Sequence, residues 1–388
     1  MSSSVLENPF QSSNTNNISQ RKGAVKFVAP QRSQFFPTLK KRVDEYFAQH
    51  QLSKSGEARL ALKTVVLLCL YVLPFVALLF LQPGWGISLL LWSVMGIGMA
   101  GVGMSVMHDA NHGAYSTNPV INWVMAHVLN LMGGSTYNWK LQHNILHHTY
   151  TNVTHMDDDI ATKPGLRLSP HVPAKKSYRY QWFHGFLLYG LTTLYWVTAK
   201  DFVQFSRYRK NNVNVLSPKE NRIFLMKLIA LKVVYFFTFL VVPTLFFNIP
   251  FLQVLAGFCL MHFLSGLILT VVFQLAHSLE GTTHPMPDGN GVIENDWAIH
   301  QMNTTMNFSP NNKLLSWYVG GLNFQVEHHL FPRISHIHYP ALSPIVRRTA
   351  EEFGVPYLQH RTFGEALKAH ITFLRKLGKL PDLEEAIG

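Results

Sequence analysis

The stretch Gly86–Met107, GISLLLWSVMGIGMAGVGMSVM, contains no charged residue and is followed directly by His108-Asp109-Ala110-Asn111-His112. A helix of about 20 apolar residues is long enough to cross the roughly 30 Å hydrocarbon layer of a bilayer. The stretch therefore predicts a membrane-spanning helix that ends at a pair of histidines. If the helix continues, His108 and His112 are four residues apart and point in the same direction.

Three further segments have the same character, and together they predict the topology. They are Leu62–Gln82, Ile223–Phe247 and Phe251–Ala276. Lys232 lies in the segment Ile223–Phe247, and its side chain is expected to extend to the membrane interface. Only short, uncharged connectors join the first span to the second and the third to the fourth, whereas residues 1–61, 108–222 and 277–388 hold nearly all Lys and Arg. The positive-inside rule places those three regions, and both termini, in the cytoplasm. We therefore expect an all-α integral membrane protein with four transmembrane helices and a cytoplasmic helical cap.

The composition of the 388 residues agrees with this class. The formal net charge of +12 arises from residues that flank the apolar spans, which favours a membrane protein over a nucleic-acid binder. Both cysteines lie inside apolar segments, which argues against disulfide or thiolate metal chemistry. We expect residues 1–34 to be a disordered polar tail, 35–360 to be the membrane domain, and 361–388 to be a cytoplasmic helix or tail. The aromatic stretch Phe183–Ala199 predicts a helix that lies in the membrane interface.

Two more histidine clusters fall in the predicted cytoplasmic regions. The second is His143-Asn144-Ile145-Leu146-His147-His148, and the third is Gln325-Val326-Glu327-His328-His329. On a helix His143 and His147 share a face, while His148 is turned about 100° away and could serve a neighbouring metal. His277 stands at the cytoplasmic end of the last span.

Eight clustered histidines and one glutamine are enough ligands for two metal ions, so we predict a dimetal site in the cap. Imidazole binds Fe, Zn, Cu and Ni, and the ligand type alone does not select among them. A single H-x-x-x-H pair would be a weak signal, but chance does not account for three clusters on one membrane face. Eleven of the other twelve histidines are interpreted as packing or surface residues: His50, His127, His155, His171, His184, His262, His300, His336, His338, His360 and His370.

The three clusters, in this order and separated by paired spans, resemble the membrane fatty acid desaturase family. The glutamine in Q-V-E-H-H is similar to the subgroup that acts between an existing double bond and the carboxyl end, the front-end desaturases. Gly320–Gln325, Leu330–Pro332, Asp296-Trp297, Gln301 and Thr304-Thr305 also look like that subgroup. The resemblance extends over residues 35–360.

The resemblance implies which residues bind metal. The box ligands would be His108, His112, His143, His147, His148, His328 and His329, with His277 matching a further histidine after the fourth span. Gln325 replaces a ligand histidine, so it could bind the metal directly, through water, or not at all. Asp109, Asp158 and Glu327, with Asp157 and Asp159, are candidates to orient the histidine rings.

The resemblance also implies the chemistry: oxygen-dependent desaturation of a fatty acyl chain, linked to coenzyme A or to a lipid, at two non-haem iron ions. No side-chain acid or base removes hydrogen from unactivated methylenes, so an oxygen-activated metal is needed. The sequence contains no H-P-G-G motif, the mark of the cytochrome-b5-like domain fused to many relatives. We therefore expect a separate electron donor, a ferredoxin or a cytochrome-b5-like protein. Two alternatives stay open: a related membrane hydroxylase or oxygenase, and a zinc-dependent membrane lipid amidase, which would need three ligands and an open water position.

Overall fold

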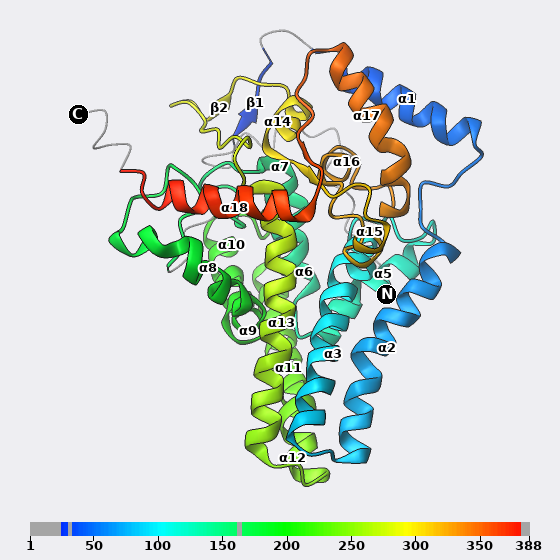
Figure 1. Cartoon of the computed structure of the whole chain (residues 1–388), viewed down its shortest axis with the longest axis vertical. Helices are drawn as coiled ribbons and strands as arrows, with labels where there is room; N and C mark the ends of the chain where they lie inside the picture. The colour runs from blue at the N-terminus through cyan, green and yellow to red at the C-terminus, as the bar shows by residue number, and fades with distance from the viewer. Residues whose placement is uncertain (1–24, 30–32, 161–164, 382–388) are drawn as a thin grey trace.

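The computed structural model describes residues 25–29, 33–160 and 165–381, and nearly all of its ordered elements are helices. In this part of the chain four helices are long and apolar enough to cross a membrane: Ala58–Leu81, Trp85–Asn111, Pro218–Phe246 and Phe251–His277. Figure 1 shows them as long, roughly upright rods below a cap of shorter helices. The predicted all-α membrane class with four spans is confirmed; the largest boundary difference is at the third span, which begins at Pro218 rather than Ile223.

Two of the four spans are single helices, and two are made of several helical segments. The first span is the single helix α2 (Ala58–Leu81), and the fourth span is the single helix α13 (Phe251–His277). The second comprises α3 (Trp85–Gly101), the π-helix η2 (Val102–Met107) and α4 (His108–Asn111). The third comprises α11 (Pro218–Phe236), the π-helix η6 (Phe237–Val241) and α12 (Val242–Phe246). The loops that join α2 to α3 and α12 to α13 lie at the lower end in Figure 1, away from the cap.

Small residues bring α3 close to its neighbours on both sides. A Cβ atom added at Gly98 would lie 2.6 Å from the carbonyl carbon of Leu70 on α2, and one added at Gly96 would lie 2.7 Å from the carbonyl oxygen of Met261 on α13. Spans that pack in lipid gain little from apolar burial, so close backbone approach at small residues supplies the contact. The second span, which leads into the first histidine cluster, is therefore held between the first and the fourth.

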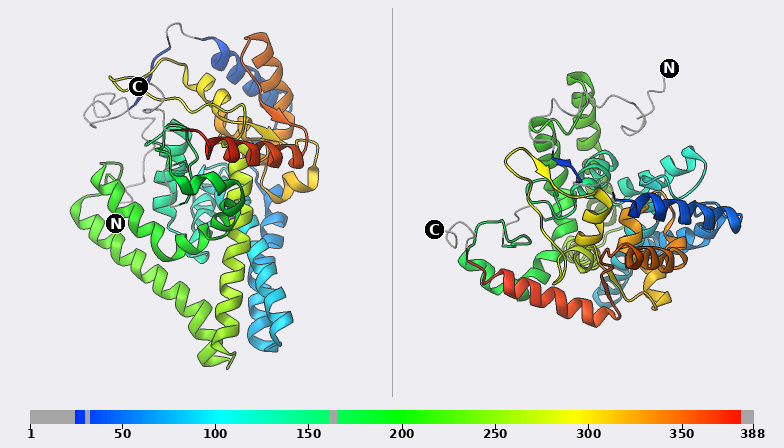
Figure 2. Two further views of the ribbon diagram at one scale, coloured as in Figure 1. Left: turned by 60° about the vertical axis from the view of Figure 1, so that its left-hand side comes forward. Right: turned by 90° about the horizontal axis from the view of Figure 1, so that it is seen from above.

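The cap is built from the segments that follow the second and fourth spans. After the second span come α5 (Pro119–Leu131), α6 (Thr136–Lys140), the π-helix η3 (Leu141–His147), α7 (His148–Tyr150), the 3₁₀ helix η4 (Lys176–Tyr180), α8 (Gln181–Gly190), α9 (Thr192–Tyr195), the π-helix η5 (Trp196–Lys200) and α10 (Asp201–Lys210). After the fourth span come β2 (Val292–Ile293), α14 (Trp297–Thr304), β3 (Asn307–Phe308), α15 (Lys313–Tyr318), α16 (Gln325–Leu330), the 3₁₀ helix η7 (His336–His338), α17 (Tyr339–Glu352), β4 (Gln359–His360) and α18 (Phe363–Leu377). The two views in Figure 2 show α1 (Phe35–Gln49) beside α17, with α18 crossing the cap.

The beginning of the described chain is ordered where we expected disorder. Residues 1–24 lie outside the described residues, but Lys26–Phe27 forms β1, which pairs in parallel with β2. The physical reason is an apolar contact, because Val25 packs in a small buried cluster with Val153 and Ile293. This part of the predicted tail is therefore a component of the cap.

The C-terminal segment is likewise part of the packed molecule. The predicted helix within 361–388 is α18, and its His370 ring contacts two other elements: Nδ1 lies 2.7 Å from the carbonyl oxygen of Ser278, and Nε2 lies 3.0 Å from the Tyr189 hydroxyl. Residues 382–388 lie outside the described residues.

Lys232 does not extend to the interface, which corrects our expectation. It is 5% exposed, and its Nζ atom lies 2.6 Å from Asp201 Oδ2 and 2.6 Å from the carbonyl oxygen of Gly133. Asp201, at the start of α10, is fully buried and also accepts a hydrogen bond from the backbone N–H of Ser135, the N-cap of α6. A buried carboxylate attracts the ammonium group inward, since leaving either charge unpaired in a low-dielectric interior is costly.

Candidate metal centre

The clustered histidines converge at the boundary between the spans and the cap, although they come from five separate elements and the turn after one of them. His108 is on α4 and His112 follows it; His143 and His147 lie on η3, and His148 opens α7. His277 is the last residue of α13, and His328 and His329 lie on α16. π-helical turns precede or contain the first two clusters, and such turns occur frequently at functional sites because the extra residue per turn redirects side chains.

One group of four imidazoles joins all three clusters. The candidate ligand atoms of His108, His112, His143 and His328 all lie within 4.8 Å of one another. The Nε2 atoms of His108 and His143 are 3.1 Å apart. Two nitrogens bound to one metal ion at about 2.1 Å would be separated by about this distance. These residues therefore form a first candidate metal group.

A second group lies beside the first. It comprises His147, His277 and His329, whose candidate ligand atoms also lie within 4.8 Å of one another. The sequence led us to pair His143 with His147, and their rings do stack with centroids 5.3 Å apart. With Asp159, their candidate ligand atoms form a third set within 4.8 Å of one another, but among the imidazoles alone His143 belongs with His108 and His147 with His277.

His148 lies between the two groups. Its Nε2 atom is 3.2 Å from that of His143, and its ring centroid is 4.6 Å from that of His328 and 4.5 Å from that of His329. The sequence predicted that His148 turns away from His143 toward a neighbouring metal. The structure instead places it next to ligand candidates of both groups.

The two nitrogens of each ring have different surroundings, and this difference tests whether the site suits metal. The Nδ1 atoms make hydrogen bonds: His147 to Asp157 Oδ2 at 3.1 Å, His328 to the Tyr339 hydroxyl at 3.1 Å, His329 to Gln301 Oε1 at 2.8 Å, and His277 to the Thr304 carbonyl oxygen at 3.2 Å. The Nε2 atoms of the same four residues are buried and have no hydrogen-bond partner. Metal-binding histidines show this pattern, since the partner on one nitrogen fixes the ring and its tautomer while the other binds the ion. The residues present therefore fit a metal.

The electrostatics of the site also favour neutral, ligand-type imidazoles. Burial lowers the pKa of His143, His148, His328 and His329 well below the usual value for histidine, and the neighbouring imidazoles lower it further. Neutral imidazole is the form that binds metal. His147 differs: burial lowers its pKa, but the carboxylates of Asp157 and Asp159 outweigh this and raise it. Those carboxylates favour positive charge at this position, which a bound cation would also supply.

Gln325 lies at the second group. Its residue is 2% exposed, its Oε1 atom is buried without a hydrogen-bond partner, and its side chain interacts with His277. The amide oxygen is thus a candidate ligand atom beside His277. The resemblance leaves open whether Gln325 binds the metal directly, through water or not at all.

The carboxylates that orient the rings are partly different from those expected. Asp109 is close to His108, with Oδ1 4.0 Å from Nδ1. Asp158 instead pairs with Arg207 and Tyr208, so the orienting role falls to its neighbour Asp157. Glu327 also differs from the expectation that it orients a histidine ring.

The carboxylate of Glu327 holds the backbone around the third cluster rather than a histidine ring. It accepts hydrogen bonds from Asn307 Nδ2 at 2.8 Å and from the Tyr357 hydroxyl at 2.7 Å. Burial raises the pKa of Glu327, and these hydrogen bonds offset part of that increase. Glu327 points away from the metal groups because consecutive residues on a helix, such as Glu327 and His328, are turned about 100° from each other.

Sequence reasoning missed three residues that contact the candidate ligands through hydrogen bonds. They are Gln301, Tyr339 and Thr304, which supply the partners of His329, His328 and His277. Gln301 and Thr304 stand in a motif that the resemblance had noted, and this was the available signal. Nothing in the local sequence around Tyr339 indicates its contact.

His336 and His338 were expected at the surface, and the structure contradicts this. They are 5% and 4% exposed, and His336 Nδ1 lies 2.8 Å from Asp109 Oδ2. Both rings lie on the short helix η7, which directly precedes α17, and both are buried there. By contrast, His262 is the hydrogen-bonded packing residue that we expected, with its Nε2 atom 3.0 Å from the Tyr235 hydroxyl.

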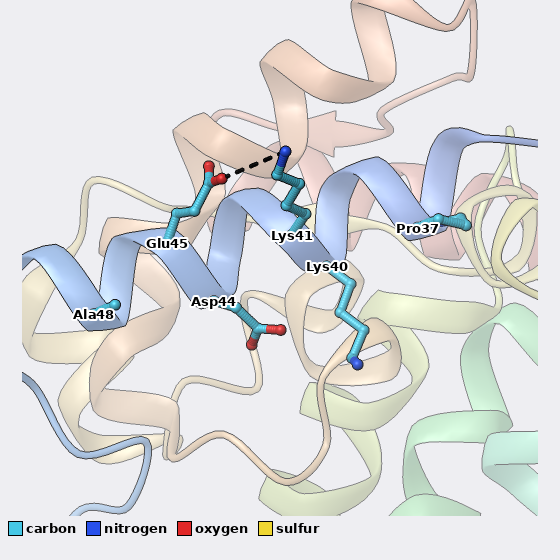
Figure 3. Close-up of a pocket in the computed structure, with 6 residues that line it drawn as sticks. All are labelled: Pro37, Lys40, Lys41, Asp44, Glu45 and Ala48. Atoms are coloured by element: carbon cyan, nitrogen blue, oxygen red, sulfur yellow. Dashed lines mark ion pairs between the residues drawn. The ribbon is translucent and has the colours of Figure 1, made fainter.

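A surface hollow of about 570 Å³ lies apart from the histidines, along the exposed side of α1. Figure 3 shows its lining on the α1 ribbon, with Lys41 and Glu45 paired across one helical turn at 3.8 Å. It contains no metal-binding side chain other than the solvated carboxylates, and we exclude it from the candidate site. Its lining residues are Pro37, Lys40, Lys41, Asp44, Glu45 and Ala48.

Comparison with known proteins identifies the family. Residues 83–361 match the fatty acid desaturase family. The chain is 36% identical over 359 residues to the sn-1 linoleoyl-lipid 6-desaturase of Synechocystis sp., an alignment that covers 92% of this chain and 98% of the relative. It is 36% identical to the enzyme of the same name from Arthrospira platensis, over 90% of this chain and 94% of the relative. It is 33% identical to the acyl-lipid (8-3)-desaturase of Physcomitrium patens, over 92% of this chain and 74% of the relative. With the histidine clusters assembled at the end of four spans, these matches show that the chain belongs to the fatty acid desaturase family.

Proposed function

We propose that the chain desaturates a fatty acyl chain at a non-haem di-iron centre held by its clustered histidines. His108, His112, His143 and His328 would hold one iron; His147, His277 and His329, with Gln325, would hold the other, and His148 lies within reach of both. The observation that carries the proposal is the set of buried, unpartnered Nε2 atoms whose rings are fixed through Nδ1. Seven imidazoles in two groups exceed what a single-zinc hydrolase needs, which favours the desaturase over the amidase.

The iron pair would supply the oxygen-dependent chemistry that removes two hydrogens from adjacent methylenes. The chain's own residues provide orientation and exclusion of water. Asp157, Tyr339 and Gln301 hold the rings in one tautomer, and burial of His147, His277 and His329 keeps bulk water from the second group. The position beside the span ends allows an acyl chain to remain in an apolar environment while it reaches the site.

The substrate that we propose is a lipid-linked polyunsaturated or monounsaturated acyl chain, with the new double bond on the carboxyl side of an existing one. Two observations support this. The two cyanobacterial relatives are named as linoleoyl-lipid 6-desaturases, that is, enzymes that act on a lipid-linked acyl chain at position 6. The third cluster also begins with Gln325, and a glutamine at this position is the feature that resembles the front-end subgroup.

We propose that the electrons come from a separate carrier, a ferredoxin or a cytochrome-b5-like protein; the 388 residues contain no H-P-G-G motif. We propose that the cap faces the cytoplasm. The first and last described elements, β1 and α18, lie on the cap side of the spans together with the metal groups (Figure 1). The basic segments flank the spans at this end, as the positive-inside rule requires.

Expression in a host that lacks polyunsaturated fatty acids, supplied with linoleate and a ferredoxin system, tests the proposal. We expect a product with one more double bond on the carboxyl side, recovered in membrane lipids, and about two irons per chain in the purified protein. His328→Ala should abolish the product, whereas His127→Ala, which changes a histidine that bonds the Trp123 carbonyl oxygen and packs on the Trp123 ring, should not. A hydroxylated product would favour an oxygenase, and one zinc without iron would contradict the proposal.

A further inference from the structure

Lys63 is a buried cation inside the first membrane span. It is 4% exposed, its Nζ atom lies 2.9 Å from Nε2 of His336, and it lies over the Trp317 ring at 5.4 Å from the centroid. Ionisable residues at such positions are expensive to retain and usually have a functional partner. No candidate metal ligand lies on α2, so Lys63 can influence the metal groups only through the residues that it contacts. Its hydrogen-bond partner is His336.

His336 passes the interaction on to Asp109. Because the ammonium group of Lys63 donates to Nε2, the neutral ring carries its proton on Nδ1 and donates it to Asp109 Oδ2, at 2.8 Å. The same carboxylate oxygen accepts from the Ser335 hydroxyl at 2.7 Å and from the His336 backbone N–H at 3.2 Å. Three donors on one oxygen fix the orientation of the carboxylate. Its other oxygen then faces His108, 4.0 Å from Nδ1.

The segment that holds Asp109 also touches a second ligand candidate of the same group. Tyr339, three residues after His336, places its hydroxyl 3.1 Å from Nδ1 of His328. Both His108 and His328 belong to the first group. In the described part of the chain, the hydrogen bonds of Lys63, His336 and Tyr339 reach no histidine of the second group.

We propose that Lys63 and His336 are positioning residues that orient His108 through Asp109 and thereby set the metal affinity of the first group alone. The inference rests on the proposed function only in that the two groups bind metal. It gives the first span, which carries no ligand, a direct part in forming the centre. It also explains why a lysine is retained within an otherwise apolar helix, at a depth where methionine would be less costly.

Cobalt(II) binding to the metal-free, full-length protein in detergent tests the proposal without reference to activity. Cobalt absorbs visible light differently in each ligand environment, so the two groups are resolved as two classes of site. Lys63→Met and His336→Leu should weaken one class by about 10- to 100-fold, the usual effect of losing a residue that orients a ligand, and should leave the other class unchanged. His336→Gln should restore affinity, since its amide oxygen can accept from Lys63 while its amide nitrogen donates to Asp109.

His262→Leu is the matched control, because His262 is equally buried but is bound to Tyr235 within the spans. It should leave both cobalt classes intact. Thermal unfolding of each metal-free variant shows whether it is folded; if Lys63→Met is not, the comparison of His336→Leu with His336→Gln decides.

Equal weakening of both classes, or no weakening of either, would overturn the proposal. Wild-type protein that binds no cobalt would contradict the metal centre and this inference together. Wild-type protein that binds cobalt in two classes but forms no desaturated product with iron would contradict the proposed function and leave the inference standing.

Discussion

At the scale of single residues, three consecutive aspartates make three different contacts. Asp157 lies 3.1 Å from His147 Nδ1, Asp158 pairs with Arg207, and Asp159 accepts a hydrogen bond from Gln142 while its other oxygen lies 3.5 Å from His147 Nδ1. A carboxylate on the ring of a ligand histidine raises its basicity and fixes its orientation. We predict that Asp157→Asn lowers iron affinity by about 10- to 100-fold, while Asp158→Asn changes it little. Iron content after dialysis against a weak chelator distinguishes the two, and equal loss in both variants would contradict the assignment.

Gln301 plays the corresponding part for His329, with an amide in place of a carboxylate. Its Oε1 atom lies 2.8 Å from His329 Nδ1, and its Nε2 atom donates to the carbonyl oxygen of His148 at 3.1 Å. Gln301→Leu removes the nearest acceptor of the His329 ring and leaves only the Thr151 hydroxyl, 3.3 Å from Nδ1, so we expect iron affinity to fall by about 10- to 100-fold. The control is Gln253→Leu, which removes a buried glutamine at the opposite end of the spans, bonded to the Pro83 carbonyl oxygen. Metal analysis of both purified variants checks the prediction. If Gln301→Leu binds iron as tightly as the wild-type protein, His329 does not need the Gln301 acceptor.

The histidines could be predicted from sequence and their partners could not, for a physical reason. Spacing along a helix brings His108 and His112 together locally, and they are neighbours in the structure, with centroids 4.8 Å apart. Asp157 and Asp159 approach His147 while Asp158 does not, and this depends on an irregular segment in which Asn152 and His155 have φ of +59° and +70°. The burial of His336 depends on Lys63 and Asp109, which are more than 200 residues away in the chain.

At the scale of elements, hydropathy predicted the spans well because a membrane helix needs only length and apolar composition. The π-helical turns were not predictable in this way, since η2 and η3 differ from α-helix by one residue per turn and carry no distinct composition. They nevertheless decide which group each histidine joins. Within η3, His143 and His147 face different imidazoles, whereas a regular helix would have aligned them more closely.

The buried pair of Lys232 and Asp201 holds the third span to the helix that leads into η3. Asp201 is fully buried and binds the Ser135 backbone N–H and the Asn138 side chain at the start of α6. Lys232→Met would leave this carboxylate without its cation, and we expect a loss of about 3–5 kcal/mol in stability. Unfolding in mixed micelles measures it. Lys227→Met, at an exposed position of α11, should have little effect, and similar losses in both variants would contradict the role of the pair.

At the scale of the whole molecule, the metal groups join the cap to the spans. The first group takes ligands from the end of α4, η3 and α16, and the second from η3, α13 and α16, so each ion would link the end of one span to two elements of the cap. Without metal, the same contact places five buried imidazoles with unpartnered Nε2 atoms together: His112, His147, His277, His328 and His329. Polar atoms buried without partners cost free energy, so the metal-free fold should be strained where the cap meets the membrane helices.

Removal of iron should therefore destabilise the junction of cap and spans more than any other part. Binding to the native state alone stabilises it by RT ln(1 + [L]/Kd), about 2.7 kcal/mol when free metal exceeds Kd a hundredfold. We expect chelation to lower the melting temperature of the wild-type protein and to increase amide hydrogen exchange in α16 and η3, while α2 and α11, which carry no ligand, exchange as before. His328→Ala should already show faster exchange in α16 and respond less to chelation. Uniform acceleration along all four spans would instead show that the metals stabilise the membrane helices themselves. Exchange unchanged by chelation would show that the imidazoles keep the cap in place without an ion.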